Sequence, residues 1–168
     1  MDNNELKQYF ELNCKPSASE RSGQKLGPEY ECLVLIPDRK NASGQSFRPL
    51  GMDEQEGVPG VLIRFQEIGA MRGEVWEGKF EGENLIGLQN QEGASITIEP
   101  GGQIELSDQP MDHLSQVETS IRNFVRDLKE SIRSIQGRLI FLGAQPLFDL
   151  DAIALSPKKR YRIMYRHM

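Results

Sequence analysis

The sequence predicts a single α+β domain, spanning residues 1–168, in which helices pack against an antiparallel sheet. Three observations favour this class. Residues 76–106 hold short alternating polar and apolar runs between Gly- and Asn-bearing turns, which is typical of a meander of strands. One long amphipathic helix follows, and a chain of 168 residues can bury one sizeable core. Strands that are grouped in the sequence beside segregated helices are typical of α+β layers.

The N-terminal part predicts a helix, a strand and a second helix, separated by loops. Residues 3–12 carry apolar side chains at roughly helical spacing, and residues 14–25 have the composition of a loop. The stretch LGPEYECLVLIP, residues 26–37, reads as a strand that ends at a proline. Residues 38–60 are rich in Gly, Pro, Ser and Asn and predict a long loop, a feature usually tied to function or disorder. Residues 61–69 predict a short helix.

The hairpin ASITIEPGGQIELS, residues 94–107, carries two glutamates although glutamate is a poor strand former. Successive strand side chains point to opposite faces, so Ile96 and Ile98 share one face and Glu99 lies on the other. Glu105 joins the polar face after the Pro-Gly-Gly turn. This polar face is either a solvated outer surface or the wall of a polar cleft. The neighbouring strands are predicted around Trp76 and at 85–88, 96–98 and 104–106.

The C-terminal part predicts a long helix, a strand and a final helix. Apolar side chains recur at steps of three and four over residues 114–135, which indicates one helix that packs on the sheet. Asp108 or Gln109 is predicted to cap its start, and Gly137 its end. The remaining strand and the final helix are predicted at 138–148 and 158–168.

The net charge of −5 hides an asymmetry, because residues 1–120 carry −11 and residues 121–168 carry +6. One part could hold cations and the other anions, which suits a metal-bound phosphate compound. A solvated basic tail would give the same balance. The acidic remainder and the scarcity of aromatic side chains argue against a nucleic-acid partner. The basic cluster comprises Lys158, Lys159, Arg160, Arg162 and Arg166.

The sequence predicts a cytosolic protein. The start MDNNELKQYF lacks the basic and apolar regions of a secretory signal, and the longest apolar run, CLVLI, is too short to cross a membrane. Cys14 and Cys32 form neither a disulfide framework nor a metal-binding motif. Cys32 is predicted to fill the core as a small apolar residue.

Four glutamates are candidate ligands of a hard cation. Glu29 and Glu31 are two residues apart on one strand and share a face, where their charges repel unless a cation or a proton lies between them. Alternatively, they protect an exposed strand edge. Glu99 and Glu105 add two more carboxylates, and oxygen ligands suit Mg²⁺. Four carboxylates that face one cleft predict a magnesium site.

Four stretches resemble motifs of the plant/proteobacterial type of glutamate–cysteine ligase. LGPEYECLVL, ASITIEPGGQIELS, FLGAQPLF and SPKKRYRIMYRHM occur in the family's order and rough spacing. They resemble IGTEHEKFGF, ASVTLEPGGQFELSG, LGxGFQPKW and MPKGRYxIMRxYM. The resemblance covers the chain from about residue 26 onward and identifies it as the N-terminal portion of such a ligase.

The resemblance implies a fold similar to that of glutamine synthetase and an ATP-dependent reaction with Mg²⁺. ATP phosphorylates the γ-carboxylate of glutamate, and the amine of cysteine displaces phosphate to give γ-glutamylcysteine, the first step of glutathione synthesis. The implied substrates are small molecules, without nucleic acid or membrane. By position, the implied metal ligands are Glu29, Glu31, Glu99 and Glu105. Gln103 is implied to line the substrate site, and Lys158 and Arg160 to act as catalytic cations that bind substrate carboxylate or phosphate.

This chain departs from the family pattern mainly on the cationic side. Tyr30 and Cys32 replace the His and Lys of EHEK, and further departures occur at Leu147, Phe148, Lys159 and Tyr165. Family members are also longer, so uncovered sheet edges are predicted to make this chain self-associate or depend on a missing segment. Two alternatives stay open: a related ligase that joins glutamate to another amine, and a catalytically silent ligase-like binding or assembly module.

Overall fold

The computed structural model describes residues 4, 8, 25–38, 46–52, 56–142, 148 and 155–167. Within the predicted N-terminal helix, only Asn4 and Gln8 are described, and both are helical. The predicted loop at 14–25 lies outside the described residues except for Lys25, as does most of the C-terminal half of the strand predicted at 138–148.

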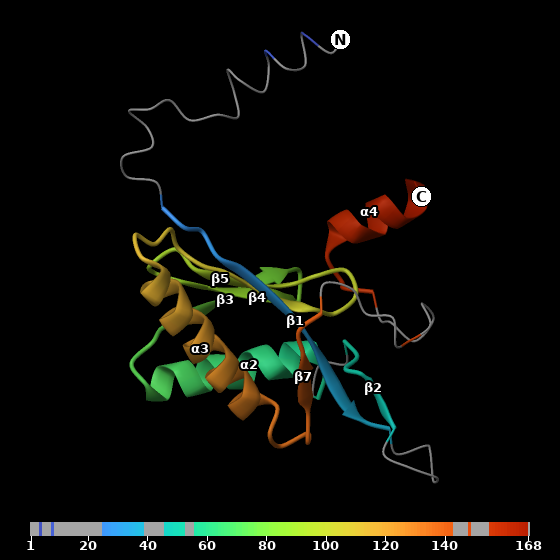
Figure 1. Ribbon diagram of the computed structural model, residues 1–168. Helices are drawn as coiled ribbons and strands as arrows, with labels where there is room; N and C mark the ends of the chain where they lie inside the picture. Colours follow the sequence, from blue (N-terminus) through green and yellow to red (C-terminus); the bar gives the residue numbers. More distant parts are fainter. Residues whose placement is uncertain are drawn as a thin grey trace.

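Among the described residues, seven antiparallel strands form the sheet, in the order β2-β1-β6-β5-β4-β3 with β7 paired to β1 (Figure 1). The antiparallel sheet and its α+β class agree with the prediction. Glycine-bearing turns connect β3 to β4 and β4 to β5, and the Pro-Gly-Gly turn connects β5 to β6. The bounds are β1 Glu29–Pro37, β2 Phe47–Pro49, β3 Trp76–Glu81, β4 Asn84–Asn90, β5 Ser95–Ile98, β6 Ile104–Ser107 and β7 Arg138–Ile140.

Strand β1 is the longest and joins the two halves of the sheet. Its first residues pair with β6, from Glu29 opposite Ser107 to Cys32 opposite Ile104. Its later residues pair with β7 and with β2. Because the N-terminal half of β1 pairs with β6, it brings Glu29 and Glu31 alongside the hairpin of β5 and β6.

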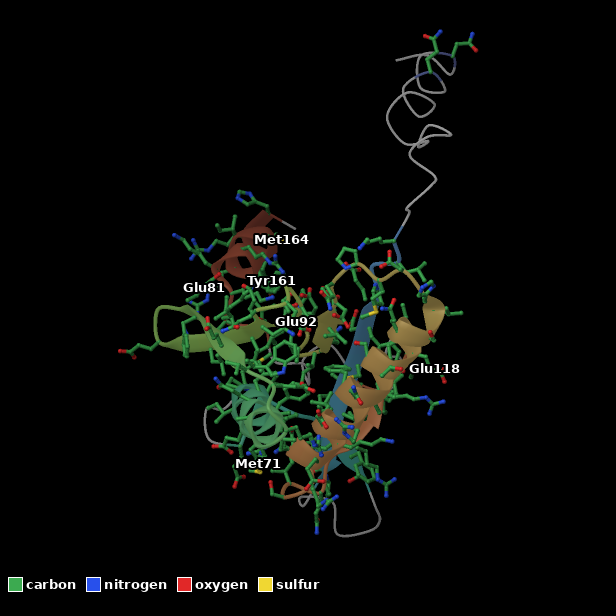
Figure 2. All side chains as sticks on the ribbon, turned by 90° about the vertical axis from the view of Figure 1, so that its left-hand side faces the viewer. Met71, Glu81, Glu92, Glu118, Tyr161 and Met164 are labelled. Carbon is green, nitrogen blue, oxygen red and sulfur yellow. The ribbon has the colours of Figure 1, made fainter. Side chains whose placement is uncertain are left out.

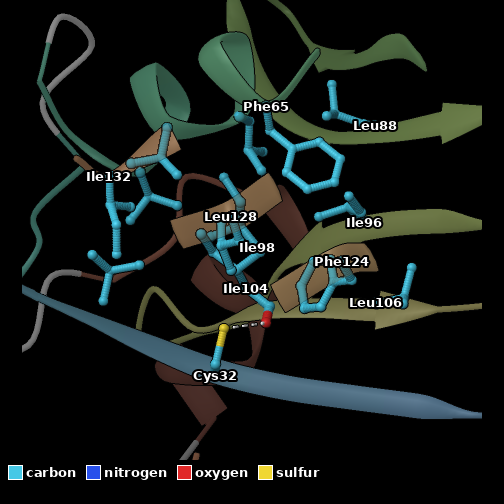
Figure 3. Packing of buried hydrophobic residues seen from close by; sticks show 14 of the residues in the cluster. Cys32, Phe65, Leu88, Ile96, Ile98, Ile104, Leu106, Phe124, Leu128 and Ile132 are labelled. Carbon is cyan, nitrogen blue, oxygen red and sulfur yellow. Dashed lines mark hydrogen bonds between the residues drawn. The ribbon is translucent and has the colours of Figure 1, made fainter. Parts of the chain in front are cut away.

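Two helices, α2 (Val58–Met71) and α3 (Leu114–Ser131), cover one face of the sheet (Figure 1). Phe65 of α2 and Phe124 of α3 pack with their ring centroids 5.9 Å apart. Burial of each large apolar side chain contributes about 1.5–3 kcal/mol. Figure 3 shows this core, in which the sheet contributes Cys32, Leu88, Ile96, Ile98, Ile104 and Leu106.

The predicted long loop at 38–60 contains regular structure that its composition concealed. β2 lies within it, and α2 begins at Val58, three residues before the predicted start. Pro59 lies in the first turn of α2, where its missing N–H costs nothing. Proline and glycine were therefore signals of a helix start here, with Gly57 as the N-cap.

Helix α3 begins and ends differently from the prediction. His113 is its N-cap, not Asp108 or Gln109, and the Gln116 side chain accepts a hydrogen bond from the His113 N–H at 2.9 Å. Asp108 instead accepts hydrogen bonds from the Ser120 hydroxyl and from the Gln109 N–H. The helix ends at Ser131, although the apolar stripe continues to Ile135 through a turn.

The C-terminal helix α4, Lys159–His167, agrees with the predicted final helix. It lies on the opposite side of the sheet from α2 and α3 (Figures 1 and 2). No helix among the described residues is both long and apolar enough to cross a membrane.

Candidate active site

The sheet face that α2 and α3 leave uncovered carries a row of polar side chains. Glu31 on β1 is directly opposite Glu105 on β6, and Glu105 is directly opposite Thr97 on β5. The next row places Glu29 opposite Ser107. The neighbours of these residues along each strand, such as Cys32 and Ile104, point into the core. The predicted alternation therefore holds, and Glu29, Glu31 and Glu105 share one face.

The carboxylates of this row repel one another. Partial burial raises the pKa of Glu31, and the charges of Glu105 and Glu99 raise it further. Opposite residues of antiparallel strands have Cβ atoms about 4.5–5.5 Å apart, close enough for such repulsion. The Ser107 hydroxyl donates to Glu105 Oε1 at 3.1 Å and relieves only part of it. A cation bound between Glu31 and Glu105 would remove the repulsion.

Glu99 lies in the turn, one residue beyond the end of β5, rather than on the strand. The ladder nevertheless continues, because the Glu99 N–H donates to the Gln103 carbonyl at 2.8 Å. Both carboxylate oxygens are engaged: Thr97 Oγ1 donates to Oε1 at 2.9 Å and the Tyr161 hydroxyl donates to Oε2 at 2.8 Å. Glu99 is thus the point where the sheet meets α4.

Two basic side chains at the start of α4 converge on the same carboxylate. Lys158 Nζ is 3.5 Å and Arg160 Nη2 is 3.6 Å from Glu99 Oε1. Burial alone would raise the pKa of Glu99, but the hydrogen bonds from Tyr161 and Thr97 and the two positive charges outweigh it and lower that pKa. Lys158 is only 5% exposed, and this burial lowers its pKa in spite of the pairing with Glu99. Both predicted cations therefore lie beside a predicted carboxylate.

Two buried polar atoms beside the turn have no hydrogen-bond partner among the described residues. They are Gln103 Oε1 and Ser156 Oγ. Ser156 is held against the turn because its N–H donates to the Pro100 carbonyl at 2.8 Å. A buried polar atom without a partner costs about 1–3 kcal/mol, which a polar ligand or a water would recover. Gln103 therefore has an acceptor oxygen that no described group uses.

The four predicted carboxylates are not equally suited to bind a magnesium ion. Within the described ranges, no three His, Cys, Asp or Glu side chains converge closely enough to form a metal cluster. Glu31 and Glu105 form a repelling pair, which suits a cation that keeps waters and phosphate oxygens in its remaining positions. Glu99 is instead neutralised by Lys158 and Arg160. Glu29 lies one row farther along β1 and is exposed.

Tyr161 and Thr97 were missed as site residues by the sequence reasoning. Tyr161 is buried under α4, between this helix and the sheet (Figure 2). The available signal was its place inside the stretch SPKKRY, one residue after Arg160. The signal for Thr97 was strand alternation, which puts its side chain on the same polar face as Glu99 and Glu105.

The backbone of α4 is also attached to the sheet. The Lys159 N–H donates to Glu81 Oε2 at 2.7 Å, which ties α4 to β3.

A cavity of about 660 Å³ lies away from this site. It is lined by residues that include Trp76, Asp108 and Ser120. None of the predicted site residues lines it.

Comparison with known proteins identifies the relationship. The profile of the Glutamate-cysteine ligase family 2 (GCS2) matches residues 25–168. The chain belongs to this family. Similar proteins include the chloroplastic glutamate–cysteine ligases of Nicotiana tabacum, 30% identical over 168 residues, and of Brassica juncea, 36% identical over 164 residues. Another, from Medicago truncatula, is 32% identical over 124 residues, 73% of this chain and 22% of that protein.

The GCS2 chain spans about a quarter of the length of these relatives. The matches cover 98% of this chain and 28% of the Nicotiana protein, and 95% of this chain and 27% of the Brassica protein. The prediction of a cytosolic protein is contradicted, because the matching relatives are chloroplastic ligases. That prediction rested on the lack of a secretory signal and of a membrane-spanning run, and neither feature distinguishes the cytosol from a plastid.

Proposed function

We propose that this chain supplies part of the active site of an ATP-dependent glutamate–cysteine ligase, located in a plastid as its relatives' names indicate. The observation that carries the proposal is the arrangement on the uncovered sheet face. The carboxylates of Glu31 and Glu105 face each other there, and the cations of α4 meet Glu99 at the end of the same hairpin. One face thus offers a place for a metal beside a place for an anion, within a glutamine-synthetase-like fold.

The chemistry requires two anions to approach each other. Mg²⁺, held by Glu31 and Glu105 with Glu29 and Glu99 nearby, would neutralise charge on ATP when bound. Lys158 and Arg160 would bind the phosphate or the substrate carboxylate and stabilise charge that develops during phosphoryl transfer. Gln103 would orient the substrate through its unpartnered oxygen. The γ-glutamyl phosphate formed in this step would then react with the amine of cysteine, which releases phosphate and gives γ-glutamylcysteine.

The proposal can be tested by an activity assay of the ligase that contains this chain. Glu105→Gln should reduce Mg²⁺-dependent formation of γ-glutamylcysteine by orders of magnitude with the fold intact. The matched control is Glu118→Gln, since Glu118 lies on α3 in an exposed pair with Arg122. Activity of the Glu105 variant within about twofold of wild type would contradict the role of this carboxylate. The same assay with other amines in place of cysteine distinguishes a glutamate–cysteine ligase from a related ligase that joins glutamate to another amine.

A silent ligase-like module is the second candidate. The observation that favours it is that no three potential metal ligands converge among the described residues. Titration of the chain with Mg²⁺ by calorimetry separates the two. Binding that is lost in Glu31→Gln and kept in Glu118→Gln supports the ligase site, and no binding in the presence of ATP supports the silent module.

The exposed edges of the sheet affect whether the isolated chain self-associates. β2 and β3 are the outer strands, and Phe80 on β3 is 61% exposed. Exposed strand edges with apolar side chains pair with other chains. We propose that the chain alone self-associates and has no ligase activity. Light scattering that gives a monodisperse monomer, together with γ-glutamylcysteine formation, would overturn this.

A further inference from the structure

Tyr161 is the buried residue of α4. Its exposed fraction is 6%, whereas its neighbours along the helix are exposed. Tyr161 is therefore the one side chain of α4 that is buried against the rest of the protein. The Tyr161 N–H also donates to the Lys158 carbonyl at 3.1 Å, which fixes the first turn around it.

The hydroxyl of Tyr161 makes two hydrogen bonds to charged groups. It donates to Glu99 Oε2 at 2.8 Å and accepts from Arg160 Nη2 at 2.6 Å. A phenolic hydroxyl can donate one proton and accept another, so both capacities are used. Hydrogen bonds to charged groups are roughly twice as strong as neutral ones.

The ring of Tyr161 contacts the same cations as the carboxylate. Arg160 Cζ lies 4.7 Å and Lys158 Nζ lies 5.5 Å from the ring centroid, within the range of cation–π attraction. Each cation is therefore held between the ring and Glu99. Long basic side chains lose considerable conformational freedom when they are fixed, so such contacts are needed to keep them in one place.

We infer that Tyr161 is a positioning residue that holds Glu99, Lys158 and Arg160 in one arrangement, so that the carboxylate side and the cationic side of the site move together. The inference deepens the proposed function and rests on it only in that the cations bind an anion. Loss of the hydroxyl removes a donor from Glu99 and an acceptor from Arg160, while the ring keeps its packing.

Tyr161→Phe on the 168-residue chain tests this, with Tyr165→Phe as the matched control on the same helix, where Tyr165 is 76% exposed. One measurement is the exchange rate of the Arg160 guanidinium protons by NMR, assigned with Arg160→Lys. The other is binding of inorganic phosphate by calorimetry in magnesium-free buffer. In Tyr161→Phe, we expect exchange to accelerate and phosphate affinity to fall, each about tenfold, because hydrogen bonds to charged groups are lost.

The outcomes separate the inference from the proposed function. Exchange and affinity that stay at wild-type values in Tyr161→Phe overturn the inference, as does an equal loss in Tyr165→Phe. A wild-type chain that binds no phosphate contradicts the proposed anion site, and the exchange rate then still decides whether Tyr161 positions Arg160. If Tyr161→Phe does not fold, Glu99→Gln provides the second variant: accelerated exchange supports the inference, and unchanged exchange overturns it.

Discussion

Glu31 and Glu105 lie directly opposite each other on β1 and β6, although 73 residues separate them in the sequence. Strand pairing thus places two carboxylates side by side on a face that no helix of the core covers. In a magnesium-free protein this pairing is unfavourable, because like charges directly opposite each other destabilise a sheet.

The first prediction concerns the charge of this pair. Glu105→Gln should lower the pKa of Glu31 towards its ordinary value of 4.5, because one of the two repelling charges is gone. In the wild type, the raised pKa means that the folded chain binds more protons than the unfolded chain between pH 4.5 and the folded pKa, so stability falls as pH rises through this window. NMR titration of the Glu31 carboxyl carbon measures the shift. An unchanged pKa would show that Glu105 is not its neighbour.

The second prediction concerns the contact between α2 and α3. Asp127 is 1% exposed and pairs with Arg72, the C-cap of α2, and with Arg126. Asp127→Asn should reduce the free energy of unfolding by about 1–3 kcal/mol, because the buried pairing is lost while the partly exposed arginines return to water. Urea unfolding measures this. Glu118→Gln, in an exposed pair, should change it by less than about 0.5 kcal/mol. Equal effects would contradict the burial of Asp127.

The third prediction concerns the close approach of β4 and β5. A Cβ at Gly87 would lie 2.5 Å from the Ile96 carbonyl oxygen, and a backbone atom cannot move aside cheaply. Gly87→Ala should therefore destabilise the protein by about 1–3 kcal/mol. Gly27→Ala is the control, since nothing lies within 4 Å of its added Cβ. Thermal unfolding compares them, and a stable Gly87→Ala would mean that the strands are spaced differently.

The fourth prediction concerns Cys32. Burial, and secondarily the charge of Glu31, raises the pKa of its thiol to about 12, and the thiol donates to the Ile104 carbonyl at 3.6 Å. The thiolate is the reactive form, so Cys32 should resist a thiol reagent at pH 8 in the folded protein and react once unfolded. A Cys14→Ser background isolates the signal. Rapid modification of the folded protein would point to a redox role that its burial argues against.

Local patterns were enough to predict the meander and its two faces. Alternation in ASITIEPGGQIELS placed Ile96 in the core and Glu105 on the opposite face, as the structure confirms. The same reasoning assigned Cys32 to the core correctly. Within the described part of residues 38–60 it missed β2 and the start of α2, because proline and glycine start helices as well as form turns. It also misplaced the cap of α3, which depends on a hydrogen bond that the His113 N–H donates to the Gln116 side chain.

Residue patterns and motifs were enough to predict the fold class, the polar face of the hairpin and the ligase family. The division of the four glutamates into a repelling pair, Glu31 with Glu105, and a neutralised carboxylate, Glu99, became visible only in the folded chain. The division depends on which side chains from distant segments meet, and strand periodicity carries no information about that. Helix α4 returns to the hairpin and brings Tyr161, Lys158 and Arg160 onto Glu99. Charge at a site is set by its neighbours in space, and these are chosen by packing rather than by local pattern.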